Sequence, residues 1–91
     1  MLRLGIIGDF NPKYHTHVAI NAAIAHASAE FGERLQSEWV PTPSIAAWGP
    51  DRVLAGFDAL WASPASPYAS AEGMLLGIQF ARSRGVPFTA T

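Results

Sequence analysis

Residues Leu2 to Gly8 read LRLGIIG, and this short apolar run decides the fold that the sequence predicts. Because the run does not alternate strictly between apolar and polar residues, it is typical of a strand covered on both faces in a parallel sheet. Turn-forming residues, DFNP, follow at positions 9–12. The alanine-rich segment Tyr14–Phe31 then places apolar residues at helical spacing and ends at Gly32, a residue type that commonly stops helices.

The rest of the chain repeats this alternation of strand and helix. Further strands are predicted at Leu35–Val40, Asp58–Ala62 and Val86–Ala90, with short helical turns at 44–48 and 51–55. A longer helix is predicted from Ala71 to Arg84, capped by Ser70 and ended by Gly85. Strands that alternate with helices indicate an open parallel sheet with helices on both faces, which is a flavodoxin-like α/β fold.

The carboxyl ends of the predicted strands are where a ligand site is expected, because open α/β sheets bind ligands outside that edge. The connections that reach this edge are Gly8–Tyr14, Ser63–Ser70 and whatever follows Thr91. A fourth strand that runs to the last residue would leave one sheet edge unpaired and one helix layer missing. We therefore expect residues 1–91 to be part of a larger single domain and not to fold alone.

The composition excludes several classes of protein. Hydrophobic residues make up 49% of the chain and charged residues only 14%, against a usual charged share of about 25%, so the chain is not disordered. The formal net charge is −1, which gives no basic surface for nucleic acid or for a membrane. With no cysteine, no apolar run long enough to span a bilayer and no signal-peptide pattern, the sequence indicates a cytoplasmic protein without disulfides.

Motifs for nucleotide or phosphate binding are missing from the first connection. The residues from Gly5 to Asp9 contain neither GxGxxG nor a P-loop pattern. Receiver domains need an acidic pair after the first strand and an Asp at the end of the third, but Asp9 has no acidic neighbour and Ser63 occupies the third strand's end. Flavodoxins need a Ser/Thr-rich first loop, and the first such residue here is Thr16. The sequence therefore disfavours a nucleotide-binding site, a receiver domain and a flavodoxin.

Histidines and aromatic residues also have simpler explanations than a ligand site. His15 and His17 would project about 200° apart on a helix, so we expect these residues and His26 to be surface or capping histidines, with no bound metal. The three tryptophans lie in different predicted elements, so core packing is the expected role of Trp39, Trp48 and Trp61. Glu72 is interpreted as a surface charge that complements a helix dipole.

The segment from Asp58 to Met74, DALWASPASPYASAEGM, together with IQFAR at 78–82 and VPF at 86–88, resembles a known family. It is similar to the glutaminase domain of CTP synthase, a class I glutamine amidotransferase, whose pattern runs DGILVPGGFG, EGK, YAR and PF. The spacing from Asp58 to Glu72-Gly73 matches without a gap. Leu4–Gly8, Val18–Ile24 and Glu38–Val40 also fit the family's opening, so the resemblance implies that residues 1–91 are the N-terminal part of one such domain.

The resemblance implies an activity in the chemistry of pyrimidine biosynthesis. The family pattern continues PFLGIC, which places a cysteine nucleophile directly after Thr91, and a His and a Glu complete its triad much later in the chain. Such a cysteine attacks the side-chain amide of L-glutamine, forms a thioester and releases ammonia without a cofactor. Because the first strand begins at residue 2, the chain resembles a free-standing amidotransferase whose ammonia acceptor is a separate protein.

The resemblance also assigns site residues in the connection after the third strand. The family's Gly-Gly pair falls on Pro64 and Ala65, and the Phe that lines its glutamine pocket becomes Ser66. The backbone N–H of Ala65 is then the oxyanion donor, and Ala65, Ser66 and Pro67 line the glutamine pocket. Pro64 has no N–H. The alternatives are a non-catalytic amidotransferase-like binding or regulatory protein and an unrelated flavodoxin-like signalling domain.

Overall fold

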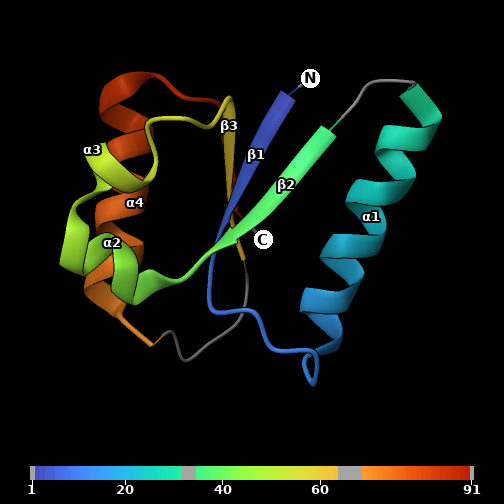
Figure 1. The fold of residues 1–91 in the computed structure, drawn as a ribbon, viewed down its shortest axis with the longest axis horizontal. Coiled ribbons are helices and arrows are strands. Elements are labelled where there is room, and N and C mark those ends of the chain that lie inside the picture. The colour runs from blue at the N-terminus through green and yellow to red at the C-terminus, as the bar shows by residue number, and fades with distance from the viewer. Residues whose placement is uncertain (1, 32–34, 64–68, 91) are drawn as a thin grey trace.

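The computed structural model describes residues 2–31, 35–63 and 69–90 (Figure 1). In this part of the chain four strands form one parallel sheet in the order β2-β1-β3-β4. The strands are β1 (Leu2–Ile7), β2 (Leu35–Val40), β3 (Ala59–Ala62) and β4 (Phe88–Ala90). In the register of the central pairs, Ile7 of β1 lies beside Val40 and Ala62, so the carboxyl ends of these three strands lie at one edge.

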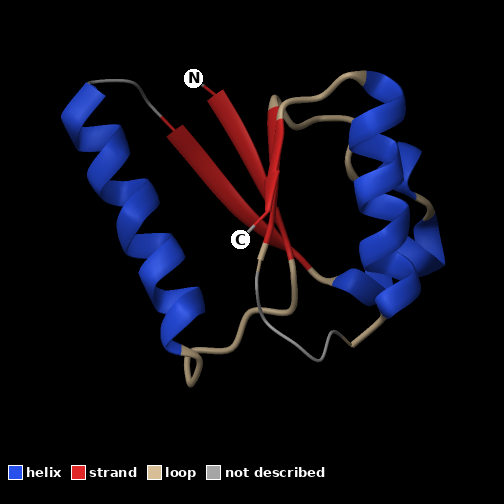
Figure 2. Cartoon of the chain, turned by 180° about the vertical axis from the view of Figure 1, so that it is seen from behind, coloured by secondary structure: helices blue, strands red, loops and turns tan. Residues whose placement is uncertain are grey.

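Helices cover both faces of the sheet, which confirms the predicted α/β fold. Helix α1 (His15–Phe31) lies on one face, and α2 (Thr42–Trp48), α3 (Pro50–Val53) and α4 (Ala71–Arg84) lie together on the other, as Figure 2 shows. None of the helices in the described ranges has the length and hydrophobicity that a membrane span requires.

The bounds of α4 agree with the prediction because both of its ends carry local signals. The Ser70 hydroxyl oxygen accepts a hydrogen bond from the Gly73 N–H at 3.0 Å, which is the usual N-terminal cap. At the other end Gly85 adopts a left-handed conformation with φ of 65°, and its N–H bonds to the last helical carbonyls. Arg82 and Arg84 in the last turn complement the helix dipole.

Other bounds differ from the prediction by one or two residues. Helix α2 begins at Thr42 and contains Pro43, because a proline in the first helical turn loses no hydrogen bond that the helix would otherwise make. Helix α3 begins at Pro50 for the same reason. The last strand begins only at Phe88, since the Val86 N–H still bonds to the Ala81 carbonyl of α4 at 3.0 Å. The predicted stop at Gly32 lies outside the described residues.

Two apolar cores hold the layers together. The larger core lies between the sheet and α2, α3 and α4, and its most buried members are Ile7, Ile45, Leu54, Leu60 and Ala81. The smaller core lies under α1, where Ile6, Ile20 and Ile24 are buried and the half-buried Trp39 and Trp61 pack against them. Strand β1 contributes to both cores, so its continuous apolar pattern is explained by burial on both faces.

Gly73 is the point of closest approach between α4 and α2. A Cβ atom there would lie well inside van der Waals contact of the Thr42 carbonyl oxygen, which is backbone and cannot turn away. We predict that Gly73→Ala lowers the free energy of unfolding of the protein by about 1 to 3 kcal/mol, measured by urea denaturation. Gln79→Ala on the exposed side of α4 is the control and should change it by about 0.5 kcal/mol or less. A Gly73→Ala protein as stable as the wild type would contradict this close packing.

Candidate functional site

The carboxyl edge of the sheet brings three connections together. The Gly8 N–H donates to the Val40 carbonyl at 3.0 Å, and the Ser63 N–H donates to the Ile7 carbonyl at 3.1 Å. A Cβ atom on Gly8 would collide with the buried Ser63 side chain, so the chain after β1 passes directly against the end of β3. The edge expected to hold a ligand is therefore closely packed around the strand ends.

Asp9 links these connections through its carboxylate. Its Oδ1 atom accepts a hydrogen bond from the Thr42 N–H at 2.9 Å. Its Oδ2 atom accepts from the Thr42 hydroxyl at 2.8 Å and from the Ala69 N–H at 2.9 Å. Hydrogen bonds to an ionised carboxylate are about twice as strong as neutral ones, so Asp9 is the strongest polar link among the β1–α1, β2–α2 and β3–α4 connections that the described residues show.

Thr42 extends the network into α4. Its side chain is fully buried, and its Oγ1 atom, whose hydrogen is given to Asp9, accepts from the Ser70 N–H at 2.8 Å. Ser70 in turn caps α4. One continuous series of hydrogen bonds therefore runs from Asp9 through Thr42 and Ser70 to Gly73. In the sequence Asp9 has no acidic neighbour and Thr42 belongs to no motif, so neither residue was predicted to be part of a site. The signal that could have found them is that both residues follow neighbouring parallel strands at the same edge.

His17 is buried, so the prediction that it is a surface or capping residue is wrong. Its side chain is fully excluded from solvent, and its ring lies against the rings of Phe10, Tyr14 and Trp39, with centroids 4.7 to 6.0 Å away. The Nδ1 atom accepts a hydrogen bond from the Asn11 N–H at 3.0 Å, so the neutral ring carries its proton on Nε2. Among the described residues Nε2 has no hydrogen-bond partner.

Burial lowers the pKa of His17 below its ordinary value of 6.5, and the nearby negative charge of Asp9 only partly opposes this effect. A proton on Nδ1 would also break the hydrogen bond from Asn11. The folded state therefore favours the neutral ring. Below pH of about 6.5 the unfolded chain binds more protons at this position than the folded chain, so acid favours unfolding.

We predict that His17 makes the melting temperature fall as the pH is lowered from about 7 to about 5.5. His17→Gln removes the titrating ring and should make the melting temperature depend less on pH than in the wild type. His26→Gln, at an exposed position of α1, is the matched control and should keep the wild-type dependence. Equal pH dependence in the wild type and the His17→Gln variant would contradict the prediction.

The three tryptophans lie in different parts of the fold. Trp39 donates through Nε1 to the Asn21 side chain at 2.8 Å and packs in the smaller core, as does Trp61. Trp48 does not pack in the core, because it is 63% exposed at the end of a short helix, with the Arg52 guanidinium 5.6 Å from its ring centroid. In the described ranges no three His, Asp or Glu side chains are placed to hold a metal ion.

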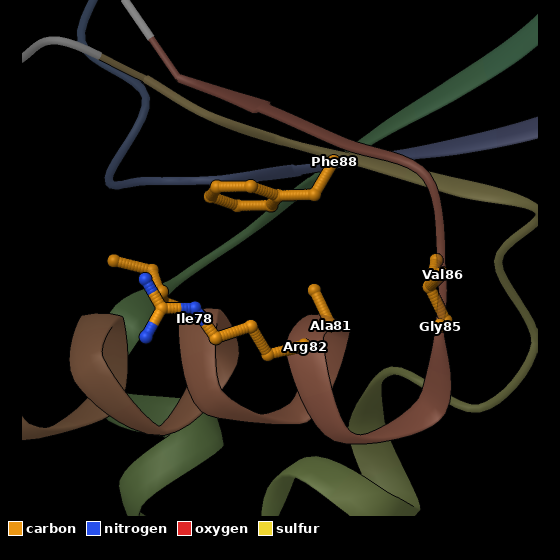
Figure 3. A pocket seen from close by; sticks show the side chains of 6 residues that line it. All are labelled: Ile78, Ala81, Arg82, Gly85, Val86 and Phe88. Atoms are coloured by element: carbon orange, nitrogen blue, oxygen red, sulfur yellow. The ribbon is translucent and has the colours of Figure 1, made fainter.

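A groove of about 400 Å³ lies between the second half of α4 and β4 (Figure 3). It is lined by Ile78, Ala81, Arg82, Gly85, Val86 and Phe88. Because α4 runs antiparallel to the strands, this groove is near the amino end of β4, away from the edge where Asp9 lies. It contains none of the residues predicted to act on a substrate.

The residues assigned to the site by resemblance lie outside the described part of the chain. These are Pro64, Ala65, Ser66 and Pro67. The structure does place the residues on both sides of them. Ser63 is held to β1 through its N–H, and Ala69 is held to Asp9 through its own. The connection that contains the predicted site therefore begins and ends at the carboxyl edge, beside the Asp9 network.

Comparisons with known proteins find a similarity to CTP synthase. No family model matches the chain. The CTP synthase of Acaryochloris marina is 26% identical over 87 residues, which is 96% of this chain and 16% of that protein. The CTP synthase of Acidobacterium capsulatum is 26% identical over 85 residues, which is 93% of this chain and again 16% of the relative. The chain thus spans only a small part of the length of the curated relatives it matches.

The fold has a close counterpart among solved structures. The Trypanosoma brucei CTPS glutaminase domain with bound acivicin superimposes with a TM-score of 0.81 at 17% identity, over 99% of this chain and 36% of that one. The fold is therefore an open parallel α/β domain like that of the glutaminase domain of this solved structure. Within that class the chain is similar, along nearly its whole length, to CTP synthase.

Proposed function

We propose that residues 1–91 form the N-terminal part of a single amidotransferase-like domain that hydrolyses L-glutamine and releases ammonia. The register of the sheet is the observation that carries this proposal. Ala62 of β3 lies opposite Ala90 of β4, so the residues that follow the two strands start side by side at the carboxyl edge. A cysteine directly after Thr91 would then lie beside the start of the connection that contains Ala65. An oxyanion donor must be close to the nucleophile, and this arrangement meets that condition.

The proposed chemistry uses this edge in two steps. The cysteine thiolate attacks the side-chain carbonyl carbon of glutamine to give a tetrahedral intermediate. A general acid then protonates the nitrogen, and the intermediate expels ammonia to leave a thioester. Water then hydrolyses the thioester and releases glutamate. The Ala65 N–H stabilises the negative charge on the carbonyl oxygen in each step, and Ser66 and Pro67 line the pocket for the rest of the substrate. The thiol must be reduced, and a cytoplasmic location would meet that condition.

A second candidate function is a binding or regulatory protein that keeps the fold and has lost the chemistry. Pro64 favours it, because proline replaces the first glycine of the family's pair and has no N–H to donate. Ser66 also favours it, since a small polar side chain replaces the aromatic residue of the pocket. Such a protein would bind glutamine without hydrolysing it.

Glutamine hydrolysis by the protein purified from its native source tests the proposal. Peptide sequencing across Thr91 identifies the next residue, and we expect a cysteine. The protein should release ammonia and glutamate in equal amounts from L-glutamine, and replacing that cysteine with Ala should lower the rate by about 10⁴-fold or more. Calorimetry with glutamine separates the second candidate. Binding without ammonia release would support the regulatory protein, and neither binding nor hydrolysis would reject both.

Variants of Ala65 test the oxyanion donor directly. We predict that Ala65→Pro, which removes the N–H, lowers kcat for glutamine hydrolysis by about 100- to 1000-fold. Ala65→Gly keeps the N–H and restores the residue of the family pattern, so it serves as the matched control with kcat close to that of the wild type. An Ala65→Pro enzyme that keeps its kcat would exclude this N–H as the donor.

A further inference from the structure

Asp9 controls one end of the β3–α4 connection. At the start of the connection, the Ser63 N–H is bound to the β1 backbone. At its end, the N–H groups of two successive residues are bound, Ala69 to the Asp9 carboxylate and Ser70 to the Thr42 hydroxyl. Both acceptors depend on Asp9, because the Thr42 hydroxyl is oriented toward Ser70 by giving its own hydrogen to Asp9.

The charge and shape of a carboxylate are required at this position. Three donors converge on its two oxygens, and Oδ2 alone accepts two of them. A side-chain amide has one oxygen and one NH₂ group, so with the oxygen kept on the Thr42 N–H its NH₂ group would face the Ala69 N–H. Asparagine would therefore leave a backbone donor of the connection without an acceptor.

We propose that Asp9 is a positioning residue for glutamine hydrolysis. By holding Ala69 and Ser70, it fixes the end of the β3–α4 connection against the first residue of α2. The connection is thereby held at the carboxyl edge, where Ala62 of β3 lies opposite Ala90 of β4. This inference rests on the proposed function. Asp9 does not contact the substrate and acts only through the backbone that it holds.

The proposal predicts a particular kinetic signature. An oxyanion donor acts on charge that develops in the transition state, so its misplacement lowers kcat more than it weakens substrate binding. We expect Asp9→Asn to lower kcat about 10- to 100-fold. The KM for glutamine should change by roughly threefold or less. A change that merely loosened the whole fold would alter both parameters and the melting temperature together.

The experiment compares four variants of the full-length protein by steady-state kinetics and amide hydrogen exchange. Asp9→Asn removes the acceptor for Ala69, and Thr42→Val removes the hydroxyl while keeping the side chain's shape. Thr42→Ser restores the hydroxyl and should return kcat to near the wild-type value. Asp51→Asn makes the same chemical change at an exposed ion pair with Arg84, so it is the matched control and should behave as the wild type.

Amide hydrogen exchange tests the inference independently of enzyme activity. In Asp9→Asn and Thr42→Val the amides of Ala69 and Ser70 should exchange faster than in the wild type, while the β1 amides keep their rates. If Asp9→Asn does not fold, the comparison of Thr42→Val with Thr42→Ser tests whether the network positions the connection. Unchanged kcat and unchanged exchange in the variants would overturn the inference, and so would equal losses in Thr42→Val and Thr42→Ser. A wild-type protein that does not hydrolyse glutamine would overturn the proposed function, and the exchange rates alone would then decide whether Asp9 positions the connection.

Discussion

The carboxylate of Asp9 at the carboxyl edge of the sheet is the interaction on which the arrangement of the edge depends. It accepts hydrogen bonds from both donors of Thr42 and from the Ala69 N–H. Thr42 begins α2, and Ala69 directly precedes the cap of α4. The Asp9 carboxylate therefore fixes how α2 and α4 meet the connection that follows β1. The close contact of Gly73 with the Thr42 backbone follows from that placement.

The parallel register explains why the functional residues are expected at this edge of the sheet. Parallel strands place all their carboxyl ends together, so connections far apart in the sequence become neighbours. Ala62 and Ala90 lie opposite each other, and the segments that follow them hold the proposed oxyanion donor and the proposed nucleophile. The same geometry brings the buried His17 near Asp9, whose negative charge partly opposes the lowering of the histidine pKa by burial. The likeness to the Trypanosoma brucei glutaminase domain extends over nearly all of these described elements.

Elements with local signals could be predicted from the sequence to the residue, and elements fixed by distant contacts could not. Helix α4 was predicted correctly because its cap, Ser70, and its stop, Gly85, are neighbours in the chain. Strand β2 was predicted correctly because it is followed by a proline. The start of β4 was placed two residues early, because Val86 still bonds to α4, which is a contact that no strand pattern reveals. Trp48 was assigned to the core by its type, and the short helix that carries it leaves it exposed.

The sequence by itself determined the order of strands and helices, the parallel sheet with helices on both faces and the resemblance to the CTP synthase glutaminase domain. These follow from hydrophobic period, capping residues and motif spacing, all of which are written locally along the chain. Only the tertiary structure decided that Asp9 and Thr42 form one network and that His17 is buried as a neutral ring. The hydrogen bonds that Asp9 accepts from Thr42 and Ala69 join residues 33 and 60 positions apart, so these partners become known only when the sheet brings the strand ends together.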